Sequence, residues 1–268
     1  MSTEPSSVSP DAIRSETRAR YARTASGCCG PASTGCCGTP TPDATAHALG
    51  YSAADTAAVP AGANLGLGCG NPLAIRSLAP GETVLDLGSG AGFDAFLAAR
   101  AVGPFGRVIG VDMTPEMLQV ARENRDKGGF TNVAFRLGEI EHLPVADASV
   151  DVVLSNCVIN LSPEKQQVFR EAFRVLRPGG RLAISDVVAL RPLSAAVRAD
   201  LELHTGCVAG AATIDDLRAM VAAAGFEAVE IRPKEELQAA VDGWFPDRGV
   251  TGLVASATIA AKKPALRT

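Results

Sequence analysis

The chain has 268 residues, 47% of them hydrophobic, and a formal net charge of −4. This length and apolar content suit one large domain, and the acidic balance excludes the basic face that nucleic-acid binding requires. The first twenty residues are polar and charged, and no apolar run reaches the roughly 18 residues that span a bilayer. We expect a cytoplasmic monomer with no nucleic-acid or membrane partner.

The first 80 residues hold few periodic signals. A short helix is expected over Asp11–Tyr21, and residues 25–80 are rich in Ala, Gly and Pro, which favours a long functional loop with one short helix. Within this loop the segment GCCGPASTGCCG carries four of the seven cysteines, namely Cys28, Cys29, Cys36 and Cys37. Such a segment cannot build a core, so we expect it to be flexible, with thiols that serve metal binding or redox exchange. The alternative is an incidental low-complexity tail.

From Glu82 onward, short apolar runs alternate with helical stretches. The expected strands are VLDLG, RVIGVD, NVAFRLG, VDVVLSN and GRLAISDV, and the expected helices are Phe93–Val102, Pro115–Lys127 and Pro163–Leu176. This alternation predicts an α/β fold with a parallel sheet. A further helix, Ile214–Ala224, precedes FEAVEIRP and VTGLVASATIAAK, which we expect to be edge strands that close the sheet.

These patterns divide the chain into three parts. Residues 1–80 form the N-terminal helix and the cysteine-rich segment, and residues 81–190 form the cofactor-binding core. Residues 191–268 form a substrate-binding insertion and the C-terminal extension that completes the sheet.

The stretch VLDLGSGAGFD at residues 84–94 joins a strand to a helix and spaces its glycines two residues apart. A dinucleotide fingerprint needs a glycine at position 93, which is Phe93, and no Lys-Ser/Thr pair makes a phosphate loop. The form D-x-G-x-G-x-G suits a ligand with an amino-acid end, whose carboxylate uses the helix N-terminus and whose ammonium uses Asp86 or nearby carbonyl groups.

Two further elements point to a nucleoside. Asp112 ends the second strand, where a carboxylate can accept hydrogen bonds from both ribose hydroxyls. Ile140 can cover an adenine face while Glu139 marks its edge. Each turn alone is compatible with an ordinary α/β connection, but three in this order are much more specific. The predicted cofactor-binding residues are Asp86, Gly88, Ser89, Gly90, Gly92, Asp112, Met113, Glu139, Ile140 and Asn156.

Residues 82–188 resemble the class I S-adenosylmethionine-dependent methyltransferases, through VLDLGSGAG, GVDMTPEML and VLRPGGRL. The resemblance implies a Rossmann-like sheet of seven strands, the last of them antiparallel, and S-adenosyl-L-methionine as the methyl donor. Because these enzymes share a sheet and differ in their acceptor, the acceptor has to be argued from the site.

Three cysteines lie outside the N-terminal segment. Cys157 follows the fourth strand, Cys207 lies in the connection after the fifth, and Cys69 lies in NLGLGCGNP ahead of the core. All three can reach the carboxyl ends of the strands, where ligands of such sheets bind. Thiolates select soft ions, and three without a fourth ligand suit a pyramidal trivalent centre better than zinc. The plainer reading is that Cys157 and Cys207 are small buried hydrophobes.

Nearly the whole chain resembles the arsenite S-adenosylmethionine methyltransferase family. The resemblance rests on the Arg20–Tyr21 pair, LGLGCGNP, VLDLGSGAGFD, VDMTPEML, EIEHLPV, SNCVINL and GCVAGA. It implies arsenic(III) bound by Cys157 and Cys207, with Cys69 as the third thiol. It also implies a redox relay between Cys69 and one N-terminal cysteine, for which Cys28, Cys29, Cys36 and Cys37 all remain candidates. An external thiol reductant such as thioredoxin or glutathione would recycle the pair.

Arsenic(III) carries its own lone pair, so such an enzyme needs no base to create a nucleophile, although His204 and His142 remain candidates for one. Two other functions stay open. One is a methyltransferase of a small organic acceptor such as a quinone ring or a thiol, and the other is a metalloid- or zinc-sequestering protein on a methyltransferase scaffold.

Overall fold

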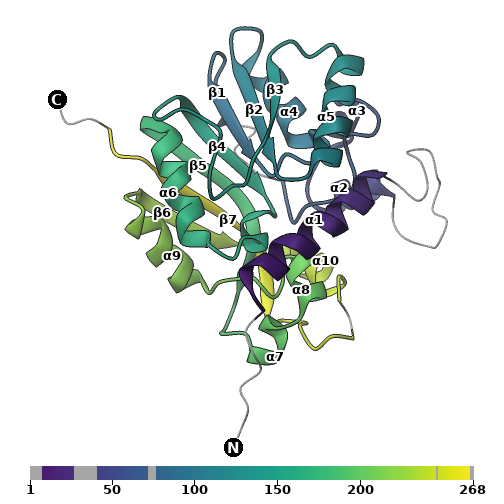
Figure 1. Ribbon diagram of the computed structural model, residues 1–268, viewed down its shortest axis with the longest axis vertical. Helices are drawn as coiled ribbons and strands as arrows, with labels where there is room; N and C mark the ends of the chain where they lie inside the picture. Colours follow the sequence, from purple (N-terminus) through teal and green to yellow (C-terminus); the bar gives the residue numbers. More distant parts are fainter. Residues whose placement is uncertain (1–7, 27–40, 72–76, 246, 266–268) are drawn as a thin grey trace, which may run out of the picture.

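The computed structural model describes residues 8–26, 41–71, 77–245 and 247–265. Its centre is one seven-stranded sheet with the strand order β3-β2-β1-β4-β5-β7-β6 (Figure 1). The strands are β1 (Thr83–Leu87), β2 (Arg107–Asp112), β3 (Val133–Leu137), β4 (Val150–Asn156), β5 (Leu176–Ala189), β6 (Glu227–Pro233) and β7 (Val254–Lys262). Strands β1 to β5 are parallel, and β7 runs antiparallel to both of its neighbours. The predicted fold class is therefore confirmed.

Helices cover both faces of the sheet. The core helices are α4 (Phe93–Val102), α5 (Pro115–Gly128), α6 (Lys165–Val175) and α9 (Ile214–Ala223). Successive side chains of a strand point to opposite faces, so each strand feeds two cores. Val84 packs with residues of α4 and α5, whereas Leu85 and Leu87 pack with residues of α6 and α9.

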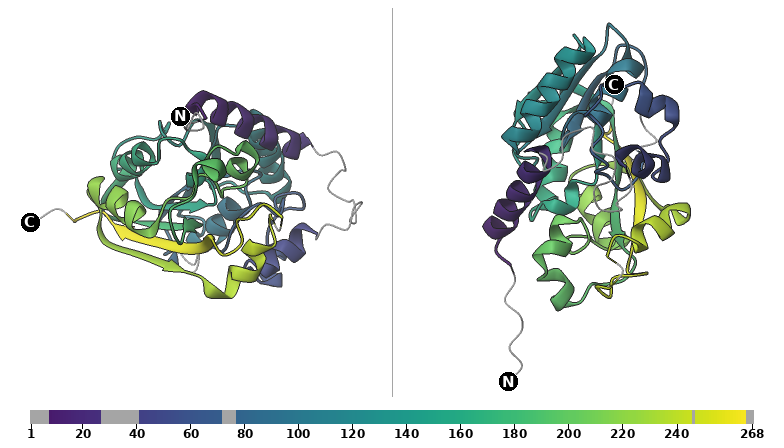
Figure 2. Two further views of the ribbon diagram at one scale, coloured as in Figure 1. Left: turned by 90° about the horizontal axis from the view of Figure 1, so that it is seen from below. Right: turned by 90° about the vertical axis from the view of Figure 1, so that its right-hand side faces the viewer.

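The remaining elements gather around the sheet. They are α1 (Pro10–Ser26), α2 (Pro42–Ala48), α3 (Ala53–Ala57), η2 (Ile159–Leu161), α7 (Ala195–Arg198), α8 (Leu201–Thr205), η3 (Glu235–Leu237) and α10 (Gln238–Asp242). Helix α1 packs against α5, α8 and η2 on the outside of the molecule (Figure 2). Within the described ranges, no helix is long and apolar enough to cross a membrane.

Three expectations about these elements were wrong. The strand β7 is not at an edge but lies between β5 and β6, so only β6 is an edge strand on that side. Residues 41–71 contain two short helices, α2 and α3, where one was expected. Helix α1 continues past Tyr21 to Ser26, because nothing in ARTAS stops a helix locally.

Candidate active site

A cavity of about 420 Å³ lies at the carboxyl ends of the parallel strands. Its wall includes residues that follow β1, β2 and β4, together with residues of α1, of the segment 63–68 and of the turn after α8. This is the position where open α/β sheets bind their ligands. All the predicted cofactor residues line the cavity except Gly92.

The glycine loop is held in the left-handed backbone region that favours glycine. The φ angles of Gly88, Gly90 and Gly92 are 65°, 50° and 97°. A Cβ at Gly90 would meet nothing within 4 Å, so the backbone there faces open space. Gly92 caps α4, and a Cβ there would collide with Phe96 and Phe135. Gly92 therefore shapes the turn, and its predicted contact with the cofactor stays a prediction.

Five acidic side chains line the cavity: Asp86, Asp94, Asp112, Glu139 and Glu141. Burial and the neighbouring carboxylates Asp94 and Asp112 raise the pKa of Asp86 well above its usual value. Burial also raises the pKa of Asp112, against the effect of the backbone N–H groups of Gly90 and Thr114, which donate to its carboxylate at 2.9 and 2.8 Å. Five acidic groups against two arginines, Arg14 and Arg20, in the lining favour a ligand that carries positive charge.

The side chain of Asp94 belongs to a hydrogen-bonded group that the sequence did not single out. Tyr51 donates its hydroxyl hydrogen to Asp94 Oδ1 at 2.6 Å, and Asn156 Nδ2 donates to Asp94 Oδ2 at 3.0 Å. Burial raises the pKa of Asp94, and these two hydrogen bonds lower it. Asn156, which was predicted as a cofactor residue, thus lines the cavity next to Asp94 and is hydrogen-bonded to it.

Buried polar atoms that lack a hydrogen-bond partner in the protein make the cavity suitable for S-adenosylmethionine. Within the described part of the chain, Asp86 Oδ2 and Ser89 Oγ are buried without a hydrogen-bond partner. A buried polar group without a partner costs stability unless a ligand or water satisfies it. The ammonium, sulfonium and ribose of S-adenosylmethionine offer positive charge and donors to this set, and Ile140 and Met113 supply apolar wall.

The three scattered cysteines are brought together beside this cavity. The Sγ atoms of Cys69 and Cys157 lie within 4.8 Å of each other, and Cys207 Sγ donates to the carbonyl oxygen of Cys157 at 2.9 Å. Interactions with the Cys207 and Cys69 side chains, together with burial, raise the pKa of the Cys157 thiol well above its usual value. Cys157 and Cys207 line the cavity, whereas Cys69 is 0% exposed and lies just behind.

Backbone geometry aims these thiols. Cys157 and Cys207 have φ angles of 58° and 64°, a conformation that costs a non-glycine residue about 1–2 kcal/mol. Both residues follow regular elements, β4 and α8, and a left-handed residue there turns the side chain toward the cavity. Strain of this kind persists where the surrounding structure requires it, and it clusters at functional sites.

The loop that carries Cys69 is tied to the sheet by polar contacts. The backbone N–H of Cys69 donates to Asn156 Oδ1 at 3.2 Å, its Sγ donates to the carbonyl oxygen of Ser185 at 3.4 Å, and its own carbonyl oxygen accepts from Ser256 Oγ at 2.5 Å. Lys234, a buried ammonium whose pKa burial lowers, donates to the carbonyl oxygen of Asn71 at 3.1 Å. The loop is thereby fixed against β4, β5 and β7.

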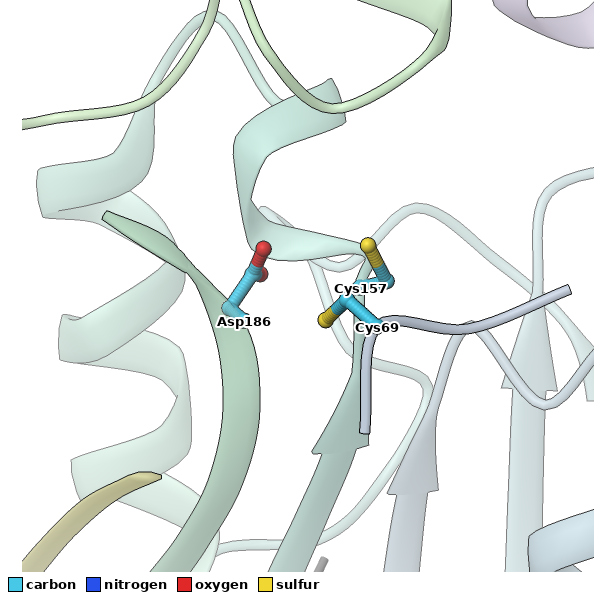
Figure 3. A group of neighbouring side chains, drawn as sticks. All are labelled: Cys69, Cys157 and Asp186. Atoms are coloured by element: carbon cyan, nitrogen blue, oxygen red, sulfur yellow. The ribbon is translucent and has the colours of Figure 1, made fainter. Parts of the chain in front are cut away.

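Asp186 is a site residue that the sequence analysis missed. One of its carboxylate oxygens lies within 4.8 Å of both Cys69 Sγ and Cys157 Sγ (Figure 3). Burial raises its pKa to about 6. The signal available was a charged residue inside the apolar run LAISDVVAL, which is unusual for a central strand.

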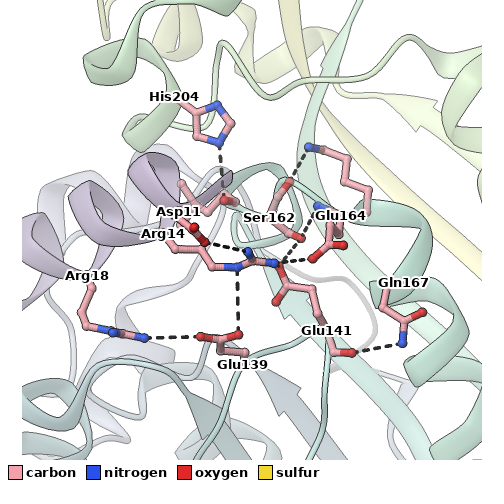
Figure 4. A network of polar contacts seen from close by, with 11 residues as sticks. Asp11, Arg14, Arg18, Glu139, Glu141, Ser162, Glu164, Gln167 and His204 are labelled. Atoms are coloured by element: carbon pink, nitrogen blue, oxygen red, sulfur yellow. Dashed lines mark hydrogen bonds and ion pairs between the residues drawn. The ribbon is translucent and has the colours of Figure 1, made fainter. Parts of the chain in front are cut away.

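Helix α1 covers the cavity through a cluster of ion pairs (Figure 4). Arg14 pairs with Glu164 and, at 3.8 Å, with Glu141, while Arg18 pairs with Glu139 at 3.4 Å. Glu139, a predicted cofactor residue, is therefore shared between the cavity wall and α1. Helix α1 also brings the predicted Arg20–Tyr21 pair to the cavity.

The other candidates fall outside the thiol cluster. His204 is buried, with Nε2 3.4 Å from the carbonyl oxygen of Leu161, and burial together with nearby Lys165 lowers its pKa to about 4. His142 is exposed. The four N-terminal cysteines, Cys28, Cys29, Cys36 and Cys37, lie outside the described residues. Trp244, from which no function was drawn, lines the cavity.

Comparison with known proteins agrees with this geometry. A family model described as a methyltransferase domain matches residues 78–225. The arsenite methyltransferase of Halobacterium salinarum is 58% identical over 265 residues, which cover 96% of this chain and 68% of that protein. The arsenite methyltransferase of Aquipseudomonas alcaligenes is 48% identical over 166 residues, which cover 59% of this chain and 47% of that protein. The chain thus spans about two thirds of the first relative's length and about half of the second's.

A solved structure is also similar. The arsenic (III) S-adenosylmethionine methyltransferase from Chlamydomonas reinhardtii matches with a TM-score of 0.59 and 34% identity, covering 82% of this chain and 73% of that one. The sheet order, the glycine loop and the matched domain define a class I S-adenosylmethionine-dependent methyltransferase. Within that class the chain belongs to the arsenite methyltransferase family, because it is 58% identical to a member of that family over 96% of its own length.

Proposed function

We propose that this chain transfers methyl groups from S-adenosylmethionine to arsenic(III) held by Cys69, Cys157 and Cys207, and so detoxifies arsenite. One observation carries the proposal: thiols from three distant parts of the chain meet beside a cavity that five acidic side chains line. The names of the relatives support the same substrate.

The cavity residues bind and orient the methyl donor. S-adenosylmethionine supplies an electrophilic methyl group on its sulfonium sulfur. Asp112 accepts hydrogen bonds from the ribose, Ile140 covers the adenine, and Asp86 and Ser89 satisfy the polar end. The open backbone at Gly90 gives the ligand room that a side chain would fill.

The thiols bind the substrate by exchanging arsenic–oxygen bonds for arsenic–sulfur bonds. Each of the three thiols forms one As–S bond, and its proton leaves with a hydroxyl group of arsenous acid as water, so the step needs no separate base. This suits thiols whose pKa is raised, as it is for Cys69 and Cys157. Positioning the arsenic lone pair is the main contribution, and well-oriented pairs gain roughly 7–11 kcal/mol.

A redox relay completes the proposed cycle. Methyl transfer raises arsenic from oxidation state three to five, and two electrons from a pair of thiols return it to three as the pair closes to a disulfide. We propose that the thiolate of one of Cys28, Cys29, Cys36 and Cys37 attacks Cys69 Sγ, so that a disulfide forms, the As–S bond to Cys69 breaks and its electron pair stays on arsenic. An external thiol such as thioredoxin or glutathione then reduces the disulfide. A reducing cytoplasm and a monomeric chain fit this cycle.

The test is methylation of arsenite in the presence of S-adenosylmethionine and excess small thiol, followed by chromatography with mass detection. We expect methylated arsenic from the wild type and none from Cys157→Ser or Cys207→Ser, while calorimetry shows S-adenosylmethionine binding in all three. No product despite cofactor binding contradicts the substrate and favours an organic acceptor.

The relay has its own test. Replacing Cys28, Cys29, Cys36 and Cys37 together by Ser should leave the fold and cofactor binding intact and reduce product to about one turnover. Unchanged multiple turnover would contradict a role for the N-terminal thiols.

A further inference from the structure

Three donor atoms of two chemical kinds share one buried space behind the cavity. Cys69 Sγ, Cys157 Sγ and a carboxylate oxygen of Asp186 all lie within 4.8 Å of one another. They come from the loop before the core, from the end of β4 and from β5 (Figure 3). Around a tetrahedral ion with Zn–S near 2.3 Å and Zn–O near 2.0 Å, donors sit about 3.5–3.8 Å apart, so a contraction of about 1 Å completes the geometry.

The carboxylate of Asp186 is held in place by donors on both of its oxygens. The N–H of Ile159 donates to Oδ2 at 2.9 Å, and Asn160 Nδ2 and the N–H of Val187 donate to Oδ1 at 2.9 and 2.7 Å. Asp186 is 2% exposed. Metal-ligating carboxylates in proteins are oriented by outer hydrogen bonds of this kind.

From this arrangement we infer that Cys69, Cys157 and Asp186 form a binding site for a thiophilic divalent cation, with Zn²⁺ as its occupant. Two thiolates and one carboxylate are a ligand set for zinc, and the fourth position is filled by water from the cavity, which Cys157 lines. Cys207 is not part of this site, because the donor atoms that lie within 4.8 Å of one another are those of Cys69, Cys157 and Asp186.

The surrounding charges balance the bound ion. Two thiolates and a carboxylate carry three negative charges, so the zinc complex has a net charge of −1. Burial raises the pKa of Asp186 and of Cys69, and the nearby ammonium groups of Lys165 and Lys234 act against this rise. Zinc binding therefore releases the protons of the two thiols to solvent. Lys165 Nζ donates to the carbonyl oxygen of Ser162 at 2.9 Å, and the described ranges hold no ion pair between Lys165 and Asp186.

The need for Asp186 as a ligand distinguishes zinc binding from arsenic(III) binding at this site. Arsenic(III) is neutral when three thiolates hold it and needs no carboxylate, whereas a divalent ion on two thiolates needs a further anionic donor. Since zinc takes two of the three thiols that the proposed function assigns to arsenic, the two occupants exclude each other. Only this competition rests on the proposed function.

The experiment uses the full chain with Cys28, Cys29, Cys36 and Cys37 changed to Ser, so that the N-terminal thiols bind no zinc. Zn²⁺ is titrated against a chromogenic chelator in this background and in the same background with Asp186→Asn. We expect one bound zinc in the background and an affinity at least about tenfold weaker with Asp186→Asn. Asp215→Asn, an exposed carboxylate on α9, is the matched control and should leave zinc binding unchanged.

Arsenite binding by the same variants separates a lost ligand from a lost fold. With Asp186→Asn, stoichiometric arsenite binding is expected to persist, because it uses the three thiols. If that variant fails to fold, zinc-edge X-ray absorption of the background protein decides, with two sulfur neighbours expected per zinc. Three or more sulfur neighbours, zinc binding that ignores Asp186→Asn, or no zinc binding in the background would each overturn the inference.

The two hypotheses fail independently. Zinc binding without arsenite methylation would contradict the proposed function and leave this site standing. Methylation without zinc binding would contradict the zinc site and leave the proposed function standing. Displacement of zinc by one equivalent of arsenite would establish the shared space.

Discussion

Two glycines of the cofactor loop face different surroundings, although they are two residues apart. At Gly88 an added Cβ would overlap the side chain of Val158, whereas at Gly90 it would enter open space. Both have positive φ, which costs alanine about 1 kcal/mol. We expect Gly88→Ala to lower stability by well over that amount. Gly90→Ala should stay folded and weaken S-adenosylmethionine binding.

Thermal unfolding measures the stability of Gly88→Ala and Gly90→Ala, and calorimetry measures their affinity for S-adenosylmethionine. The Gly90→Ala protein should keep most of the wild-type melting temperature and lose cofactor affinity. If it binds S-adenosylmethionine as tightly as the wild type does, the ligand does not lie against Gly90.

Because His204 is buried, we expect the free energy of unfolding to fall as the pH becomes more acidic. The pKa of His204 is lowered from 6.5 to about 4, so between these values the unfolded chain binds a proton that the folded chain does not. The free energy of unfolding therefore falls as the pH drops from 6.5 to about 4, by up to about 3 kcal/mol. Asp186 acts in the opposite direction, because its pKa is raised from 3.8 to about 6 and the folded chain binds the extra proton between these values.

The His204 contribution is isolated by substitution. Urea unfolding at several pH values should show a smaller loss of stability toward acid in His204→Gln than in the wild type. His47→Gln, at an exposed position, should follow the wild type. Equal pH slopes in all three proteins would mean that His204 is not buried in its neutral form.

At the scale of elements, ion pairs help to hold α1 on the cavity, beside the packing of Tyr21 and its hydrogen bond to Thr205. Only Ile13 and Thr17 are buried among the residues of α1. Arg14 forms ion pairs with the carboxylates of Glu139, Glu141 and Glu164. We expect Arg14→Gln to release α1, speeding proteolysis within residues 10–26 and weakening cofactor binding by about tenfold, since hydrogen bonds between charged groups contribute about 1.5–3 kcal/mol each.

Arg23, whose side chain is 68% exposed and pairs with Glu16 of the same helix, supplies the control Arg23→Gln. Limited proteolysis with mass detection and calorimetry of cofactor binding measure both effects. Equal cleavage rates in the two variants would show that packing, not the Arg14 cluster, holds the helix.

Local sequence patterns were enough to predict the residues of the cofactor cavity. The remaining site residues come together through the pairing of distant segments, which local patterns do not predict. The motif around Gly90 and the strand end at Asp112 are contiguous, so their chemistry is visible in the sequence. Asp186 could not be assigned to the thiols, because its distance from Cys69 depends on which strands pair. The same applies to Lys234, which meets the Cys69 loop only after β6 has joined the sheet.

The place of β7 shows the same limit at a larger scale. Its apolar residues predicted a strand correctly, but the last strand in the chain was expected at an edge. The structure pairs it with β5 on one side and β6 on the other. A hydrogen-bonded partner on each side is a property of the whole sheet, and periodicity within residues 249–261 carries no information about it.

For the whole molecule, we expect β7 to make the predicted parts 81–190 and 191–268 unfold as one cooperative unit, because it pairs with a strand of each. Ile259 is 1% exposed and pairs with Ile184 on β5 and Ile231 on β6, within the core that α6 and α9 cover. We expect Ile259→Ala to lower the free energy of unfolding by about 2–5 kcal/mol. The loss should appear as one transition at lower denaturant, because the cavity it leaves touches strands of both parts.

Thr258→Ala, at the neighbouring half-buried position of the same strand, is the matched control and should cost much less. Fluorescence of Trp244 and far-ultraviolet circular dichroism, followed through the same urea titration, report on the C-terminal part and on the whole chain. Coincident transitions mean that the sheet unfolds as a unit through β7. Two separated transitions in Ile259→Ala would show instead that residues 191–268 unfold by themselves, and that the thiol site can lose Cys207 while the cofactor loop stays folded.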